Sequence, residues 1–88
     1  MLWEGMRMTL EERVIKVVKI NLENEFEVSL ESNLTQYLEV DSFSKLMILC
    51  GLEEEFSLNI DESEFEDIEL VSDIVDKMRK KYPQIEGE

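Results

Sequence analysis

The sequence contains no histidine and a single cysteine, Cys50. These two residue types are the usual zinc ligands, and histidine is the base of the common catalytic triads, so neither kind of site is expected. One cysteine allows no disulfide within the chain, which is typical of the reducing cytoplasm, and we expect a cytoplasmic location. No apolar run is long enough for a signal peptide or a membrane-spanning helix.

Basic residues are also few, with nine Lys and Arg against 22 Asp and Glu, and the formal net charge is −13. Between Ile20 and Asp76 we count 17 acids and one base, Lys45. Nucleic acids and anionic membrane surfaces require Lys and Arg, so neither is an expected partner. The acidic middle of the chain instead favours partners with basic patches. The alternative is that the acidity only keeps a small protein in solution.

Eighty-eight residues allow one domain with a modest core. Apolar residues recur at helical spacing in three segments, which predicts long helices over residues 10–21, 42–56 and 71–81. A capping box, Thr9-Leu10-Glu11-Glu12, precedes the first helix, and Pro83 ends the last. We therefore expect an all-α domain with an ordered core over about residues 9–82.

The remaining segments are predicted to be less regular. Residues 22–40 form a long loop pinned by a few apolar side chains, and one short helix is expected at Ser63–Asp67 around Phe65. The ends, residues 1–8 and 83–88, are expected to be flexible. The prediction is thus three long helices and one short one.

The helix expected at 42–56 carries two apolar stripes. One stripe consists of Ile48, Leu49, Leu52 and Phe56, and the other of Phe43, Leu46, Met47 and Cys50. Periodicity alone slightly favours burial of both, with a docking surface for the second as the alternative. The acids Glu53, Glu54 and Glu55 that end the helix indicate a solvated face.

Asp41 and Ser42 stand at the start of this helix. Either side chain can cap it by accepting a hydrogen bond from a free backbone amide, and Asp41 also suits the positive end of the helix dipole. Without a histidine Ser42 has no base to activate it, so no constellation supports catalysis by this chain.

The order of elements from about Thr9 to Tyr82 resembles the acyl carrier protein family. Asp41-Ser42-Phe43 is similar to that family's Asp-Ser-Leu attachment motif, and the run Leu-Glu-Glu-Glu-Phe at 52–56 is similar to a second family motif. Ile60, Asp61, Glu62, Ile68 and Val71 follow at the family's spacing. The resemblance implies a four-helix bundle of the acyl carrier type, with a long loop between its first two helices.

The resemblance also implies a function. Ser42, beside Asp41, would be esterified by 4′-phosphopantetheine taken from coenzyme A by a separate phosphopantetheinyl transferase. The arm would hold an acyl group as a thioester for fatty-acid, polyketide or related biosynthetic enzymes, and the chain itself, a monomer, would have no catalytic activity. The implied acyl pocket is lined by Leu52, Ile60, Phe65 and Ile68. Acyl ligases, acyltransferases or ketosynthases with basic docking patches would meet Phe43, Leu46, Met47, Cys50, Glu53 and Glu54.

Several positions depart from the family pattern, and among them Ser44 and Met47 stand where acids are frequent. Glu39 replaces a common glycine, Lys45 adds a positive charge, and Phe65 replaces a small residue and is expected to shorten the acyl pocket. These departures indicate a specialised carrier. Two alternatives remain: an aminoacyl, D-alanyl or peptidyl carrier of the same fold, and an unmodified acidic helical interaction module in which Ser42 is only a cap.

Overall fold

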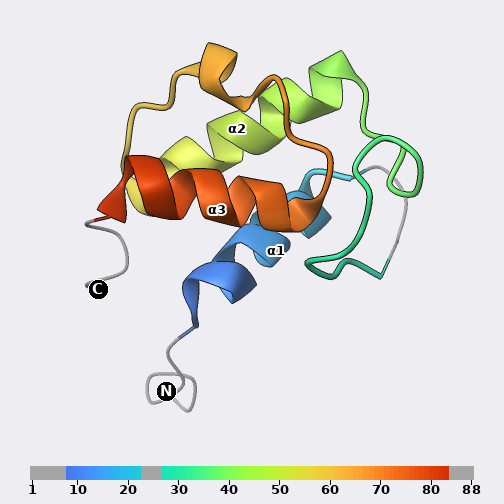
Figure 1. Cartoon of the computed structure of the whole chain (residues 1–88), viewed down its shortest axis with the longest axis horizontal. Coiled ribbons are helices and arrows are strands. Elements are labelled where there is room, and N and C mark those ends of the chain that lie inside the picture. Colours follow the sequence, from blue (N-terminus) through green and yellow to red (C-terminus); the bar gives the residue numbers. More distant parts are fainter. Residues whose placement is uncertain (1–7, 23–26, 84–88) are drawn as a thin grey trace.

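The computed structural model describes residues 8–22 and 27–83. They form three α-helices, α1 (Leu10–Ile20), α2 (Ser42–Phe56) and α3 (Val71–Lys81), and one 3-10 helix, η2 (Glu62–Phe65) (Figure 1). No strand occurs within these residues, although Asn33 and Leu70 make an isolated bridge. The expected all-α class is confirmed. The flexible ends expected at 1–8 and 83–88 lie outside the described residues, except for Met8 and Pro83.

The helix starts agree with the local sequence signals. In α1, the Glu12 amide donates to Thr9 Oγ1 at 3.1 Å and the Thr9 amide donates to Glu12 Oε1 at 2.8 Å, so the capping box is confirmed. The expected short helix differs in type and position. It is a 3-10 helix that begins earlier, because the Asp61 carboxylate accepts from the amide and the hydroxyl of Ser63.

The described part of the long loop, residues 27–40, is joined to the start of α3. The Val71 amide donates to Ser32 O at 3.1 Å, and the Ser72 amide donates to Leu30 O at 2.9 Å. The first amides of a helix have no acceptor inside the helix, and here the loop supplies them. The expectation of a loop is confirmed over these residues, which are held by main-chain bonds as well as by apolar side chains.

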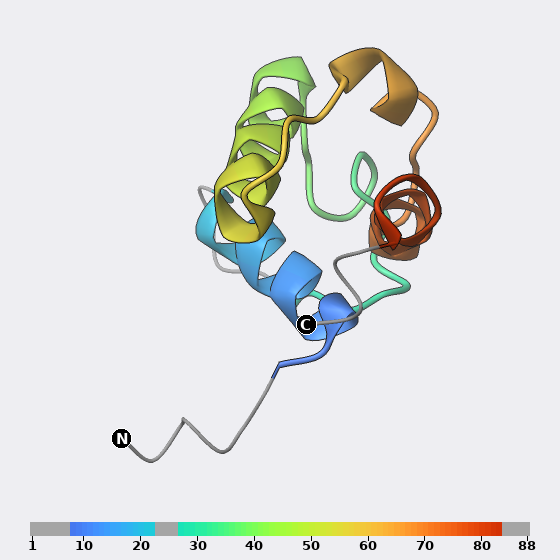
Figure 2. The same cartoon turned by 90° about the vertical axis from the view of Figure 1, so that its left-hand side faces the viewer.

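The core depends on the irregular segments as much as on the helices. Helix α1 packs against both α2 and α3. Figure 2 shows α2 and α3 on opposite sides of the molecule, with η2 above the space between them. Phe65 of η2 and Leu34 and Leu38 of the loop are buried in the same apolar cluster as the helix residues. These segments therefore fill the space that the three helices leave.

Glu55 fixes α2 to α1, so the interpretation of this residue as part of a solvated face is wrong. Arg13 Nε donates to Glu55 Oε2 at 2.8 Å, and Lys16 Nζ lies 2.9 Å from Oε1. The Arg13 guanidinium also lies over the Phe56 ring, 4.2 Å from its centroid. These contacts cover the edge of the core with charged groups that pair with one another.

Candidate functional site

The start of α2 separates the roles of Asp41 and Ser42. The Asp41 side chain accepts a hydrogen bond from the Ser44 amide at 2.8 Å, which makes Asp41 the N-cap and Ser42 the first helical residue. This hydrogen bond holds the pKa of Asp41 below its usual value. Ser42 is exposed. The interpretation of the Ser42 side chain as the helix cap is therefore wrong, whether or not the residue is modified, and its hydroxyl is available on the surface.

The loop reaches this helix start through a strained residue. Glu39 has a φ of 58°, in the left-handed region where residues with a Cβ are disfavoured. The Val40 amide donates to Leu34 O at 2.8 Å and closes the turn just before Asp41. The backbone thus adopts at Glu39 the conformation that a glycine would favour.

The face of α2 that carries Ser42 adjoins the segment leading to η2. Ser42, Leu46, Leu49 and Glu53 are spaced so that they follow one line along the helix. At the end of this line the Glu53 carboxylate accepts from the Ile60 amide at 2.8 Å. The Leu58 amide donates to Glu53 O at 3.1 Å. The chain after α2 therefore returns beside the line on which Ser42 stands.

The four residues predicted to line an acyl pocket belong to one apolar region. Leu52 and Phe65 are fully buried and Ile68 is 9% exposed, and the partly buried Ile60 packs against the same cluster. Phe65 therefore points into the core and does not cover the surface. Its ring lies inside the molecule, in the element that lies above the space between α2 and α3 (Figure 2).

The second apolar stripe of α2 is exposed. Phe43 is 69% exposed, Leu46 41% and Met47 40%, and Cys50 is exposed beside them. The preference for burial drawn from periodicity is wrong, because no described element packs over this stripe. We call these four residues the α2 stripe.

The two acids predicted to meet a partner differ. Glu54 is exposed and lies on the side of α2 that carries Met47 and Cys50. Glu53 is only partly exposed, and its carboxylate is already bound to the Ile60 amide. No pattern in the sequence indicates this hydrogen bond, which follows the left-handed turn at Ser57, where φ is 55°.

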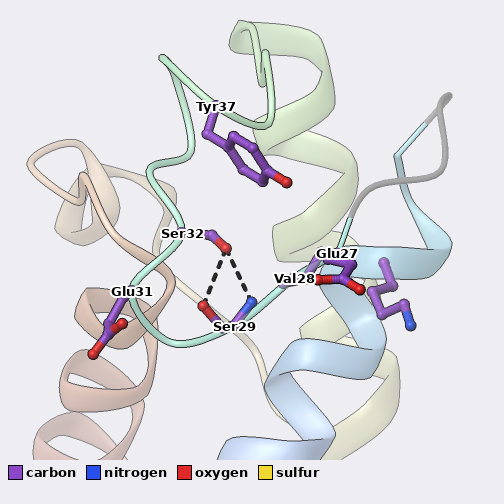
Figure 3. A pocket seen from close by; sticks show the side chains of 7 residues that line it. Glu27, Val28, Ser29, Glu31, Ser32 and Tyr37 are labelled. Carbon is purple, nitrogen blue, oxygen red and sulfur yellow. Dashed lines mark hydrogen bonds between the residues drawn. The ribbon is translucent and has the colours of Figure 1, made fainter.

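A hollow of about 430 Å³ lies at the loop between α1 and α2 (Figure 3). Its lining mixes acids, one lysine, two serines and Tyr37. The Ser29 amide donates to Ser32 Oγ at 3.0 Å, and the two hydroxyls lie 3.4 Å apart. None of the residues predicted from the sequence lines this hollow, and its buried serine serves the loop's own hydrogen bonding.

In the described part of the chain, no group of three or more His, Cys, Asp or Glu side chains is placed to hold a metal ion. No helix in residues 8–22 or 27–83 has the length and apolar character needed to cross a bilayer.

Comparison with known proteins identifies a related protein of known family. The chain is 32% identical over 72 residues to an acyl carrier protein of Rickettsia bellii (strain RML369-C), a match that covers 81% of this chain and 84% of the relative. A scan against protein-family models finds no match.

Proposed function

The chain belongs to the acyl carrier protein family, and from this premise we propose that it carries an acyl group on a 4′-phosphopantetheine arm attached to Ser42. The observation that carries the proposal is the division of roles at the start of α2. Asp41 caps the helix, so the Ser42 hydroxyl is exposed and can be esterified without loss of the cap. When bound, the arm supplies a thiol that holds the acyl group as a thioester.

The proposal extends to the fold and to the setting. We propose that the three helices and η2 together correspond to the four-helix bundle of the family, with the short helix reduced to a 3-10 turn. The chain acts as one carrier domain and as a monomer, has no catalytic activity of its own, and works in the cytoplasm, where coenzyme A supplies the arm.

The α2 stripe is the proposed docking surface for the enzymes that load and use the carrier. Phe43, Leu46 and Met47 give it an exposed apolar centre, and Glu54 gives it an acidic end. Such a surface fits a transferase, ligase or ketosynthase that presents an apolar patch beside Arg or Lys. Glu53 contributes through its contact with Ile60 and not as a free charge.

The test of carrier function is loading in vitro. The protein is incubated with coenzyme A and a phosphopantetheinyl transferase, and its intact mass is measured. We expect one added phosphopantetheine in the wild type and in Ser44→Ala, a matched control two residues along the helix, and none in Ser42→Ala. Loading of Ser42→Ala, or no loading of the wild type, would sink the proposal.

The buried ring of Phe65 is proposed to limit the length of the acyl chain. Phe65→Ala removes a fully buried ring at a cost of about 3–5 kcal/mol, a large share of the stability of a small domain, so Phe65→Leu is the better variant. We expect Phe65→Leu to protect long acyl thioesters from hydrolysis better than the wild type does. Equal protection of short and long chains in both proteins would refute this role.

Two alternatives stay open. An aminoacyl, D-alanyl or peptidyl carrier shares the fold and the attachment serine, and it is distinguished by which ligase charges the loaded protein. An unmodified interaction module predicts that Ser42 is never loaded, so the mass measurement above separates it from both carriers.

A further inference from the structure

Lys45 stands out by charge and by position. It is the one basic residue between Ile20 and Asp76, a stretch that contains 17 acids. It follows Ser42 by three residues within α2, so the two side chains are neighbours on the helix surface. Helical side chains lean towards the N-terminus, so the flexible lysine stem can reach over the turn that holds Ser42.

In the part of the chain that the structure describes, no carboxylate forms an ion pair with the Lys45 ammonium. The first turn of α2 contains no acid, and the carboxylate of its N-cap, Asp41, accepts a hydrogen bond from the Ser44 amide. Asp67 is paired with Lys77 at 3.0 Å. Within the described residues no carboxylate lies within 4 Å of the Lys45 ammonium.

Lys45 nevertheless faces a defined side of the molecule. It is half-buried, unlike the exposed Ser42 and Phe43. The hydrogen bond from Lys77 is the main reason that the pKa of Asp67 is lowered, and Lys45 adds a weaker attraction of the same sign. Lys45 precedes the buried Ile48, Leu49 and Leu52 by three, four and seven residues, so it lies along the side of α2 that faces the core and carries Leu52 of the proposed acyl pocket.

We propose that Lys45 binds the phosphodiester of the arm on Ser42 and turns the arm towards the side of α2 that faces η2. The proposal rests on the proposed function, because it needs the phosphodiester on Ser42. A lysine one turn along provides a mobile positive charge within reach of that group. The residues proposed to line the acyl pocket lie on the same side, so the contact would favour entry of the chain between α2 and η2.

The test uses the loaded protein and ³¹P NMR of its single phosphodiester. We expect Lys45→Met, which keeps the apolar stem, to shift the ³¹P signal and to remove its dependence on added salt. Lys45→Arg should restore both, and Lys80→Met, which removes an exposed lysine of α3, should match the wild type. The ¹⁵Nζ signal of Lys45 in the unmutated protein should also move on loading, while that of Lys80 stays in place.

The outcomes separate this inference from the carrier function. Suppose that Ser42 is loaded, that the ³¹P signal of loaded Lys45→Met matches that of the loaded wild type, and that the Lys45 ¹⁵Nζ signal of the wild type does not move on loading. The role of Lys45 is then overturned, and the carrier function stands. If Ser42 takes up no phosphopantetheine, both proposals fall together. The ¹⁵Nζ measurement uses the unmutated protein, so it tests the inference even if Lys45→Met folds poorly.

Discussion

At the scale of single residues, the backbone before Ser42 contains an avoidable strain. Glu39 has a φ of 58°, which costs a residue with a Cβ about 1–2 kcal/mol, whereas glycine adopts it freely. Glycine also loses more entropy on folding, by about 0.5–1 kcal/mol. We predict that Glu39→Gly raises the free energy of unfolding by up to about 1 kcal/mol in urea titrations. Glu39→Gln is the control for the lost charge, and an equal gain in that variant would contradict the backbone explanation.

Glu53 and Glu54 are adjacent acids with different tasks. The Glu53 carboxylate accepts from the Ile60 amide, and a hydrogen bond to a charged group contributes about 1.5–3 kcal/mol. We predict that Glu53→Ala destabilises the fold by roughly this amount, while Glu54→Ala changes stability by less than about 0.5 kcal/mol.

Glu54 also tests the proposed docking surface. Glu54→Lys should slow loading by a transferase with a basic patch and should weaken the dependence of the loading rate on salt. Its thermal unfolding should match the wild type. A loading rate that is indifferent to both Glu54→Lys and salt would argue against electrostatic docking at this end of α2.

At the scale of elements, the crossing of α1 and α2 depends on Gly51. A Cβ at this position would lie 2.8 Å from Val17 Cγ1 and 2.9 Å from Asn21 Nδ2. Val17 is buried, and the side-chain amide of Asn21 donates from Nδ2 to Val17 O at 2.8 Å, so neither side chain can move freely. Overpacking costs about 1–3 kcal/mol, against about 1 kcal/mol gained from replacing glycine within a helix.

We therefore predict that Gly51→Ala lowers the free energy of unfolding by about 1 kcal/mol. Val17→Ala should be less harmful in the Gly51→Ala background than in the wild type, because the new methyl group occupies space that Val17 Cγ1 vacates. Chemical denaturation of the four proteins in this double-mutant cycle measures the coupling. A stabilised Gly51→Ala variant would show that the two helices have room to separate.

The elements also show how far the sequence predicts this molecule. Thr9, Glu12 and Pro83 act within a turn or two, so they predicted the helix limits closely. Whether Phe43 is exposed depends on where the loop and η2 pack, which no local pattern contains. The bond between Glu53 and Ile60 joins residues on either side of a turn, and the pairing of Glu55 with Arg13 joins two helices. Neither has a signal in the spacing of the residues.

At the scale of the whole molecule, a formal net charge of −13 opposes the compact state, while the ion pairs between elements stabilise it. Burial raises the pKa of Glu55, but the hydrogen bonds and charges of Arg13 and Lys16 outweigh it, so the pKa lies below its usual value. A carboxyl whose pKa is lowered by folding stabilises the fold fully at a pH above its pKa in the unfolded chain. This contribution is lost as the pH falls through its lower pKa in the folded protein.

We predict that Glu55→Gln is less stable than the wild type at pH 7 and that the difference shrinks below about pH 4.5, the ordinary value for a glutamate. Acidification also relieves the repulsion among the many acids, so the two proteins must be compared at each pH. Glu66→Gln, which removes an exposed acid outside the ion pairs between elements, is the control. Unfolding curves whose separation does not change with pH would contradict the role of Glu55.

If this molecule carries a group on Ser42, as we propose, the mass of the protein isolated from the cells that make it will reveal that group. Intact-mass and fragment-ion measurements would give both the group and its position. We predict phosphopantetheine on Ser42 in a substantial share of the molecules, with the additional mass of the acyl cargo in some of them. An unmodified Ser42 throughout, or phosphopantetheine on any other residue, would contradict the account.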